Sequence, residues 1–535
     1  MPDREKTDAL VIGTGLAGLS FALTFAPYGR VCVIAKRAPD ETNTSRAQGG
    51  IAAACDPLDT VEAHVKDTLR AGSGLCHEDV VRMICREGPV AIRQLQQWGI
   101  GFAAAADGIA LDLTKEGGHS ARRIAHAKDA TGRSIEAAML ATASAHPNIT
   151  ILDGHVAVDL ISTRTGRPSA PEVLGAYVLD SRTGKVVTIG ADVTCLATGG
   201  AGKVYLYTTN PDIASGDGIA MAYRAGARIA NLEFVQFHPT CLFHPQAKAF
   251  LISEALRGEG GMLRLITGER FMDRYDPRGE LATRDIVARA IDAELKHRGH
   301  EYVLLDISHK PAAFVTERFP TIHATCLQYG IDITRQPIPV VPAAHYQCGG
   351  VMTDTEGRTT LPRLFACGEV AHTGLHGANR LASNALLEAT VMGIRAAGAA
   401  VQERMARGDA TSRDTVPAWD TVGTSDSDES VVITHNWDEV RRTMWNYVGI
   451  VRTDKRLARA LARVTHLQEE IRDYYWNFTV TGDLIELRNL ALVAELIIRC
   501  AQARKESRGL HYMLDYPGED AEFARDTIVE RTFRA

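Results

Sequence analysis

A glycine turn near the start of the chain constrains the fold more than any other feature. The buried-strand run 9–12 leads into Gly13-x-Gly15-x-x-Gly18, a helical pattern follows, and a second strand run covers 31–34. This order is a βαβ unit, in which the glycines permit a tight turn and the helix N-terminus presents free N–H groups to a pyrophosphate. The turn therefore predicts a dinucleotide site that includes Gly13, Thr14, Gly15, Leu16, Ala17 and Gly18.

Two later strand patterns also end in small turns that contain glycine. The run 192–196 is followed by Ala197-Thr198-Gly199-Gly200, and the run 364–367 is followed by Gly368-Glu369. A single nucleotide-binding fold could bring these strand ends together with the first glycine turn, because ligands bind at the carboxyl ends of parallel strands.

The end of the second strand departs from the usual dinucleotide fingerprint. An acidic residue commonly holds the ribose hydroxyls there, whereas this strand ends in Ala35-Lys36-Arg37. A basic pair could indicate the 2′-phosphate of NADP. However, the polar loop 43–50 follows directly, and a ligand that so many separate segments contact is long. A flavin dinucleotide fits that pattern better than a nicotinamide one.

The chain length of 535 residues indicates two to four domains. Residues 233–342 have a mixed pattern of their own and are predicted to form an inserted domain. Residues 408–430 are polar and acidic, which favours a flexible linker or surface loop over an acidic docking tail. Beyond them, Val440, Met444 and Val448 recur at helical spacing, so a helical domain is expected from about 431.

Composition excludes several classes of protein. Lys and Arg number 59 against 65 Asp and Glu, a net charge of −6 that argues against a nucleic-acid binder. The sequence has no run of about 18 uncharged apolar residues, so no membrane-spanning helix is expected. The charged first residues do not resemble a signal peptide. The ten cysteines are scattered without a Cys-x-x-Cys pair. We therefore predict no metal site and a reducing, cytoplasmic setting.

Several short motifs occur along the chain in a specific order. They are Ala47-Gln48-Gly49-Gly50, Gln236-Phe237-His238-Pro239-Thr240, Glu254-Ala255-Leu256-Arg257-Gly258-Glu259-Gly260, Arg284-Asp285, His345-Tyr346, His376-Gly377-Ala378-Asn379-Arg380 and Glu506-Ser507-Arg508-Gly509. Through these motifs the chain resembles, over nearly its whole length, the flavoproteins of the succinate dehydrogenase and fumarate reductase superfamily, and within it the branch that oxidises L-aspartate.

The resemblance implies an α/β fold (α+β overall) with FAD as cofactor. It assigns residues 1–232 and 343–407 to a Rossmann-like FAD-binding domain, 233–342 to an α+β capping domain that holds substrate, and 431–535 to a C-terminal helical bundle. The family commonly carries a lysine where Lys36 stands, so the missing acid is no anomaly. Besides the first glycine turn, the expected cofactor contacts are Lys36, Asn43, Thr44, Ser45, Arg46, Ala47, Gln48, Gly49, Gly50, Thr198, Gly199, Asp217, Glu369, Ser383, Ala385 and Leu386.

A small dicarboxylate is the expected substrate, and a buried dianion requires fixed positive charge and hydrogen-bond donors. Taken alone, each candidate residue has an ordinary structural explanation. By resemblance, His238, Ser253, His345 and Arg380 hold the two carboxylates, and Arg284 acts at the carbon that is oxidised. Glu254 and Arg257 match a proton-relay pair of fumarate-reducing relatives. A guanidinium hardly deprotonates, so electrostatic stabilisation by Arg284 is an alternative to acid–base chemistry.

Two positions separate the aspartate-oxidising branch from its respiratory relatives. Alignment on the motif at 47–50 places Asn43 where those relatives carry a histidine that bonds covalently to FAD, so a non-covalent cofactor is expected. Glu116 stands where an apolar aromatic residue is usual. A carboxylate there would repel a plain dicarboxylate but would attract the ammonium group of an amino acid.

The resemblance implies oxidation of L-aspartate to iminoaspartate, with oxygen or fumarate as acceptor, at the first step of de novo NAD biosynthesis. Because the imine is unstable, quinolinate synthase is the expected functional partner. One alternative is a soluble fumarate reductase or succinate dehydrogenase flavoprotein subunit, which Asn43 and Glu116 argue against. The other is a non-catalytic flavoprotein scaffold, which the dense set of His, Arg and Ser residues argues against.

Overall fold

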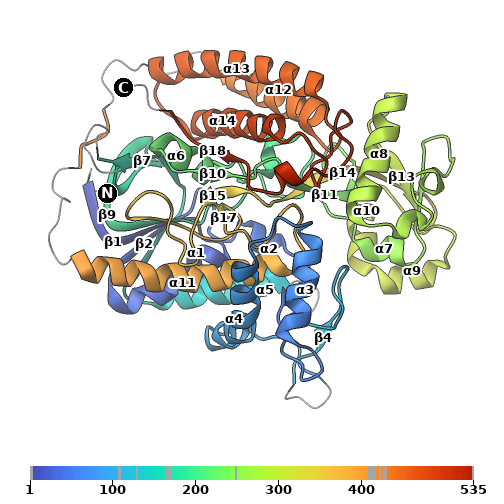
Figure 1. The fold of residues 1–535 in the computed structure, drawn as a ribbon, viewed down its shortest axis with the longest axis horizontal. Helices are drawn as coiled ribbons and strands as arrows, with labels where there is room; N and C mark the ends of the chain where they lie inside the picture. Colours follow the sequence, from blue (N-terminus) through green and yellow to red (C-terminus); the bar gives the residue numbers. More distant parts are fainter. Residues whose placement is uncertain are drawn as a thin grey trace.

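The first glycine turn follows the carboxyl end of an inner strand of a seven-stranded sheet in a computed structural model of the chain (Figure 1). The strand order is β6-β2-β1-β9-β8-β7, and β16 also pairs with β9. The structure describes residues 4–105, 110–127, 131–163, 171–247, 250–407, 416–420, 425 and 430–532. The strands are β1 (Arg4–Ile12), β2 (Val31–Ile34), β6 (Ile149–Leu152), β7 (His155–Ser162), β8 (Val173–Asp180), β9 (Lys185–Leu196) and β16 (Leu364–Ala366).

Strand β1 shows why this sheet is the centre of the fold. It pairs in parallel with β2 on one side and with β9 on the other. Its residues alternate between two cores, since Leu10 and Ile12 pack in one cluster and Ala9 and Val11 in another. The last four residues of β1, 9–12, are apolar because they are buried on both faces, as the sequence pattern predicted, whereas its first five residues are polar.

Helices cover both faces of this sheet (Figure 1). On the lower face in that view lie α1 (Leu16–Phe25), α3 (Val61–Ala71), α4 (Glu78–Gln97), α5 (Thr131–Ala145) and α11 (Asn384–Arg407). Helices α1 and α11 cross so closely that a Cβ on Gly393 of α11 would lie 2.7 Å from the carbonyl oxygen of Ala17 in α1. The upper face carries α6 (Asp217–Ala225), α12 (Ser430–Val448), α13 (Asp454–Asn477) and α14 (Gly482–Ala503).

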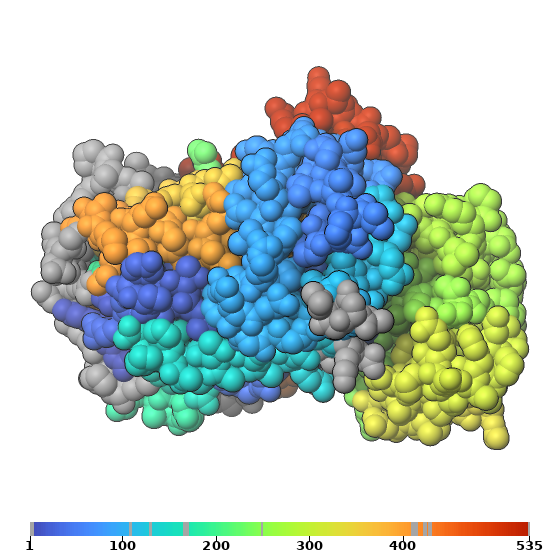
Figure 2. All heavy atoms as spheres, turned by 90° about the horizontal axis from the view of Figure 1, so that it is seen from below, coloured from blue at the N-terminus to red at the C-terminus, as the bar shows by residue number. Residues whose placement is uncertain are grey.

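A second lobe stands at one end of the molecule (Figure 2). Its antiparallel sheet has the order β11-β14-β13-β12 and its own apolar core. The strands are β11 (Val235–Leu242), β12 (Met262–Arg264), β13 (Val303–Asp306) and β14 (Ile338–Gln347), and the helices are α7 (Glu254–Gly258), α8 (Arg284–Arg298), α9 (Ala312–Arg318) and α10 (Pro320–Gln328). The lobe confirms the predicted α+β insertion as a fold feature, while its limits at 233 and 342 stay predictions.

The C-terminal helices agree with the sequence pattern. Val440, Met444 and Val448 are fully buried in the cluster that also packs on the central sheet. Most of the predicted linker, at 408–415, 421–424 and 426–429, lies outside the described residues. In its described part, Val416 is buried against Ile161 and Leu174, so this part packs on the sheet. None of the described helices is long and apolar enough to cross a membrane.

The described residues also form two small sheets. One has the order β3-β5-β4, with β3 (Ile51–Ala52), β4 (Leu113–Thr114) and β5 (Ile124–Ala125). The other has the order β17-β15-β10-β18 and joins strands from distant parts of the chain. Its strands are β10 (Ile229–Ala230), β15 (Gly350–Met352), β17 (Ala371–His372) and β18 (Ile528–Val529).

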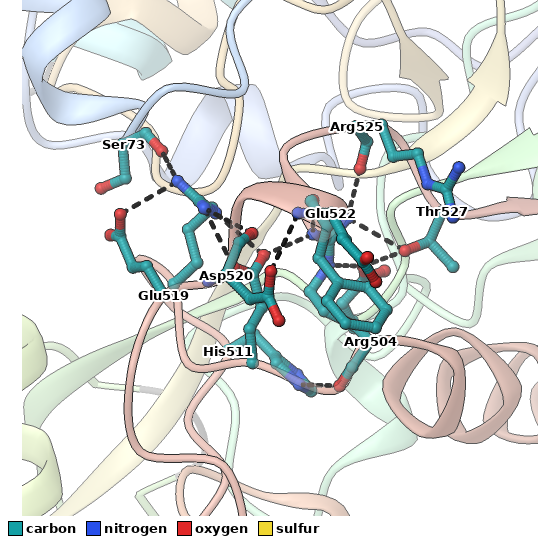
Figure 3. Close-up of polar contacts among 12 residues, drawn as sticks. Ser73, Arg504, His511, Glu519, Asp520, Glu522, Arg525 and Thr527 are labelled. Atoms are coloured by element: carbon teal, nitrogen blue, oxygen red, sulfur yellow. Dashed lines mark hydrogen bonds and ion pairs between the residues drawn. The ribbon is translucent and has the colours of Figure 1, made fainter.

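A buried ionic network fastens the segment after α14 (Figure 3). Arg504, 1% exposed, pairs with Glu233 and Glu506, and it donates to the carbonyl oxygen of Arg525 and to the hydroxyl of Thr527. Arg508 pairs with Glu506 and donates to the carbonyl oxygen of Ser73. The motif at 506–509 therefore has a structural role, because it binds the C-terminal segment to the rest of the protein.

Candidate active site

One cavity of about 980 Å³ brings the predicted cofactor and substrate residues together. Its wall combines the first glycine turn, the loop 35–50, the turns at 197–199 and 367–369, and side chains of the second lobe. Gly18 is the exception among the predicted cofactor residues, because it lies behind the wall. The predicted residues that line the cavity are Gly13, Thr14, Gly15, Leu16, Ala17, Lys36, Asn43, Thr44, Ser45, Arg46, Ala47, Gln48, Gly49, Gly50, Thr198, Gly199, Asp217, Glu369, Ser383, Ala385 and Leu386.

The glycine turn has the tight geometry that a dinucleotide site requires. Gly13 has a φ of 117°, and a Cβ on it would lie 2.2 Å from the carbonyl oxygen of Ala197. A Cβ on Gly18 would lie 2.1 Å from the carbonyl oxygen of Gly13, so Gly18 serves the turn rather than the wall. Gly15 is the N-cap of α1 and provides no side-chain cap. The N–H of Leu16 donates to the Thr44 hydroxyl at 3.1 Å, and the remaining N–H groups of the first turn are available to a phosphate.

The cavity also fits the rest of FAD. It is long enough to join the glycine turn to the second lobe, and its wall includes the α2 loop (α2, Asn43–Arg46). The buried Oδ1 atom of Asn43 has no hydrogen-bond partner among the described residues. An orphaned polar atom on a cavity wall fits a site that a polar ligand completes.

The side chain of Lys36 is held by protein groups on every side of its ammonium group. Its ammonium group lies 2.7 Å from Asp217, 2.7 Å from Glu486 and 2.7 Å from the Ser215 hydroxyl. Burial lowers the pKa of Lys36, but the two carboxylates outweigh it and raise the pKa overall. An ammonium has three donors, so Lys36 ties the end of β2 to α6 and α14.

Two histidines face the cavity from adjacent strands of the second sheet. His238 on β11 and His345 on β14 have ring centroids 5.8 Å apart. Burial, followed by nearby arginine charges, holds the pKa of each well below its ordinary value. Both imidazoles are therefore neutral at pH 7. The Nδ1 of His345 lies 2.8 Å from the hydroxyl of Thr209, and the Nδ1 of His238 accepts from the N–H of Thr240.

Arg380 is a buried cation with an open donor. Its guanidinium lies 4.6 Å from the ring centroid of Tyr346 and donates to Gln236 at 2.8 Å. Its buried Nε has no hydrogen-bond partner in the described part of the chain. Burial lowers the pKa of Arg380, although it stays charged at pH 7 because guanidinium groups do not deprotonate in proteins. A carboxylate in the cavity would satisfy the open donor.

The Tyr346 ring under Arg380 is itself fixed by a buried network. Its hydroxyl lies 3.1 Å from His376 and donates to Glu388 at 3.1 Å. Burial raises the pKa of Glu388, but the His376 charge and the donors around it outweigh this and lower the pKa overall. Tyr346 therefore positions Arg380 from behind.

Arg284 and Glu254 form an ion pair on the cavity wall. The Nε of Arg284 lies 2.5 Å from a Glu254 oxygen. Burial raises the pKa of Glu254, but Arg284 and Arg257 together lower it overall, so Glu254 is a carboxylate. Arg257 lies behind the wall, 3.8 Å from Glu254, and donates to the carbonyl oxygen of Glu280. Of the predicted catalytic residues, Arg284 and Glu254 line the cavity and Arg257 does not.

The remaining substrate candidates lie on the same wall. Ser253 is the N-cap of α7, and its hydroxyl accepts from the N–H of Ala255 at 3.3 Å. Glu116 accepts a hydrogen bond from the Ser383 hydroxyl at 2.6 Å. Both line the cavity, so the wall combines cationic and neutral donors with the carboxylates of Glu254 and of Glu116, which lies in the loop before β5.

Asn43 is held by the side chain of Glu369. Its amide nitrogen donates to Glu369 at 3.0 Å, and the other Glu369 oxygen accepts from the N–H of Gln347. Burial raises the pKa of Glu369 to about 7. The side chain that replaces the expected histidine is thus fixed by a polar contact at the turn after β16.

Sequence reasoning missed residues that act through these side chains. Thr209 holds His345, and Gln236 and Tyr346 hold Arg380. Gln236 lies two residues before His238, and Tyr346 directly follows His345. This closeness to a predicted site histidine is the signal in the sequence that points to both residues. Thr209 had no comparable signal, because its contact joins positions 136 residues apart.

The fold and the cavity define a dinucleotide-dependent flavoprotein of two lobes. The family model described as "FAD binding domain" matches residues 8–386, and "Fumarate reductase flavoprotein C-term" matches 437–534. The chain is 58% identical to L-aspartate oxidase of Pseudomonas aeruginosa, with 99% of each chain covered. It is 49% identical to the chloroplastic L-aspartate oxidase 2-a of Nicotiana tabacum, over 95% of this chain and 82% of the relative.

Solved structures give the same result at lower identity. The flavoprotein of a mutant E. coli quinol fumarate reductase superposes with a TM-score of 0.88 at 31% identity, covering 99% of this chain and 96% of that one. The chain belongs to the L-aspartate oxidase family, within the flavoproteins that include fumarate reductase.

Proposed function

We propose that this protein binds FAD without a covalent bond and oxidises L-aspartate to iminoaspartate. One observation carries the proposal: a single cavity joins a dinucleotide-type glycine turn to Arg380, Arg284, two neutral histidines and the carboxylate of Glu116. Relatives named L-aspartate oxidase, 58% and 49% identical over nearly the whole chain, support the same activity.

The substrate end of the cavity is suited to an amino dicarboxylate. Arg380 offers its open Nε to one carboxylate, with Tyr346 and Gln236 holding the guanidinium in place. His238 and His345 act as neutral donors, so they bind a carboxylate without exchanging a proton with it. Ser253 adds a hydroxyl. Glu116 would pair with the α-ammonium, a contact that succinate and fumarate cannot make.

The oxidation removes a hydride from the α-carbon and a proton from the nitrogen. FAD, when bound, supplies the hydride acceptor. The protein orients the α-carbon through the two carboxylate contacts and excludes water. Arg284 places its charge at the reacting carbons, and the Glu254 carboxylate holds that guanidinium. For the reverse transfer to fumarate, Arg284 and Arg257 keep their charge and act electrostatically beside the Glu254 carboxylate.

A non-covalent cofactor follows from Asn43. A carboxamide is a poor nucleophile, and this one is engaged with Glu369. After acid precipitation, yellow flavin should stay in the supernatant. Flavin fluorescence that remains with the denatured polypeptide would contradict this part of the proposal.

The acceptor and the setting belong to the same proposal. Oxygen or fumarate would reoxidise the cofactor, and the neighbouring fumarate reductase structures support the second. The unstable imine implies coupling to quinolinate synthase in NAD biosynthesis. All ten cysteines are free thiols, in line with a cytoplasmic setting.

Steady-state turnover of purified, FAD-loaded protein tests the activity. We expect oxidation of L-aspartate with either acceptor and little oxidation of succinate. Succinate oxidation that exceeds aspartate oxidation would favour the fumarate reductase alternative. No turnover with either substrate, in protein with full FAD content, would favour a non-catalytic scaffold.

A further inference from the structure

Three potential metal ligands meet outside the active-site cavity. They are His77 at the start of α4, His372 on β17, and Asp526 in the segment before β18. One ligand atom from each residue lies within 4.8 Å of the other two. None of the three lines the cavity described above, so the proposed function does not use them.

The distances suit a small ion. The Nε2 atoms of His77 and His372 lie 2.9 and 3.4 Å from the same oxygen of Asp526. In a tetrahedral zinc site with bonds of about 2.0–2.2 Å, neighbouring ligand atoms lie roughly 3.3 Å apart. Both distances to Asp526 are near that value, and the two imidazole nitrogens lie within 4.8 Å of each other.

One ligand atom is buried without a hydrogen-bond partner. The His372 side chain is 3% exposed. Its Nε2 makes no hydrogen bond within the described part of the chain, although it faces Asp526. A buried polar atom of this kind is uncommon and points to a missing ligand.

The surrounding residues hold the three ligands in place. The second oxygen of Asp526 accepts from the amide of Asn231 at 2.6 Å. Arg504 binds the carbonyl oxygen of Arg525 and the hydroxyl of Thr527, so both neighbours of Asp526 are fixed (Figure 3). Such outer contacts orient the ligands of protein metal sites.

His77 is also held in place. Its backbone N–H donates to the carbonyl oxygen of Gly374 at 2.8 Å. Gly374 has a φ of 89°, and a Cβ on it would lie 2.3 Å from the His77 ring. The His77 side chain is 43% exposed, so the cluster opens to solvent and leaves room for a water molecule as fourth ligand.

We propose that His77, His372 and Asp526 form a zinc site that joins the C-terminal segment to α4 and β17. Two imidazole nitrogens favour zinc over magnesium or calcium, which prefer oxygen ligands. The ion would bridge three segments that are distant in the sequence. Its role is structural, because the cluster lies outside the cavity.

Zinc titration of the FAD-loaded protein, after dialysis against a chelator, tests the site. We expect one Zn²⁺ per chain by calorimetry and by atomic absorption, and a rise in the unfolding temperature. Mg²⁺ should neither bind nor compete. His77→Gln should weaken zinc binding at least tenfold and abolish the rise in unfolding temperature, while FAD content and the circular dichroism spectrum stay unchanged.

His466→Gln is the matched control, because His466 is an exposed histidine that also pairs with a carboxylate, Glu470, at 3.2 Å. It should bind zinc as the wild type does. Asp526→Asn is a second test variant and should weaken binding as His77→Gln does. No stoichiometric zinc binding by the wild type, or equal binding by the wild type and both test variants, would overturn the proposal and leave a metal-free His–Asp–His cluster.

Discussion

Arg380 and Arg284 line one cavity but have different surroundings. Arg380 is fixed by Tyr346 and Gln236 and keeps a donor open, whereas Arg284 is paired with Glu254. A carboxylate clamp acts in the ground state and the transition state alike, whereas a charge beside the reacting carbon acts mainly as electrons move. We therefore assign binding to Arg380 and chemistry to Arg284.

This assignment predicts a split between two variants. Arg380→Leu should raise the KM for aspartate by about one to two powers of ten, since a charge-assisted hydrogen bond contributes about 1.5–3 kcal/mol. Its kcat should change less. Arg284→Leu should lower kcat while the inhibition constant of succinate changes little. Steady-state kinetics and succinate inhibition measure both.

FAD content is the control for this comparison and should match the wild type in both variants. If both bind succinate normally and lose only kcat, Arg380 is not the clamp. If Arg284→Leu keeps near-normal turnover, the assignment of chemistry to that residue is wrong.

Glu116 gives a prediction about specificity. Glu116→Gln keeps a side chain that can accept from Ser383 but removes the charge that would pair with the α-ammonium. Aspartate oxidation should fall by about one to two powers of ten, because the lost contact is worth roughly 1.5–3 kcal/mol. Fumarate reduction should be unchanged or faster. An equal loss in both reactions would show that Glu116 does not recognise the amine.

At the scale of elements, α5 carries a buried acid next to the cofactor loop. Glu136 is 1% exposed and accepts from the Thr42 hydroxyl at 3.1 Å. Burial raises its pKa from 4.5 to about 8. The folded protein therefore keeps a proton that the unfolded chain loses, and this carboxyl lowers the stability of the fold as pH rises from about 4.5 to 8.

Glu136→Gln should remove this pH dependence. At pH 5 the variant and the wild type should have similar unfolding temperatures. At pH 8.5 the variant should be the more stable, by up to a few kcal/mol, since each pKa unit corresponds to about 1.4 kcal/mol. Calorimetry at the two pH values measures the difference. A difference that does not change with pH would contradict the ionisation of Glu136 as its cause.

Local patterns predicted the elements that are long and regular. The apolar run in β1, the glycine turn and the spacing of Val440, Met444 and Val448 each depend on neighbours within a few residues. The sheet β17-β15-β10-β18 was not predicted, because two- and three-residue strands have no readable period. The packing of Val416 on the central sheet was also missed, since its partners lie far away in the sequence.

The candidate site shows the same limit. Residue types and motif order indicated which side chains lie near the ligand, and the cavity wall includes nearly all of them. Their partners could not be read from the sequence. Lys36 finds Asp217 and Glu486 only through the three-dimensional packing of β2, α6 and α14. The placement of Arg257 behind the wall likewise depends on Glu280.

At the scale of the whole molecule, the cavity joins both lobes and the central sheet, so cofactor binding should stabilise all of them. Removing FAD should lower the apparent unfolding temperature and expose the second lobe to protease, and adding FAD should reverse both effects. A ligand at 100 times its Kd contributes about 2.7 kcal/mol. Equal protease resistance of the FAD-free and FAD-loaded proteins would contradict this prediction.

The pairing of β18 with β10 has a consequence for synthesis on the ribosome. Thr527 donates its N–H to Asn231, a contact across 296 positions of the chain. At about 5–20 residues per second, translation takes roughly 15–60 s to cover that separation. During this interval β10 lacks its neighbour β18, and the Glu233 carboxylate lacks its ion-pair partner Arg504. The β10 edge is therefore a surface on which a nascent chain can pair wrongly until the C-terminal segment has been made.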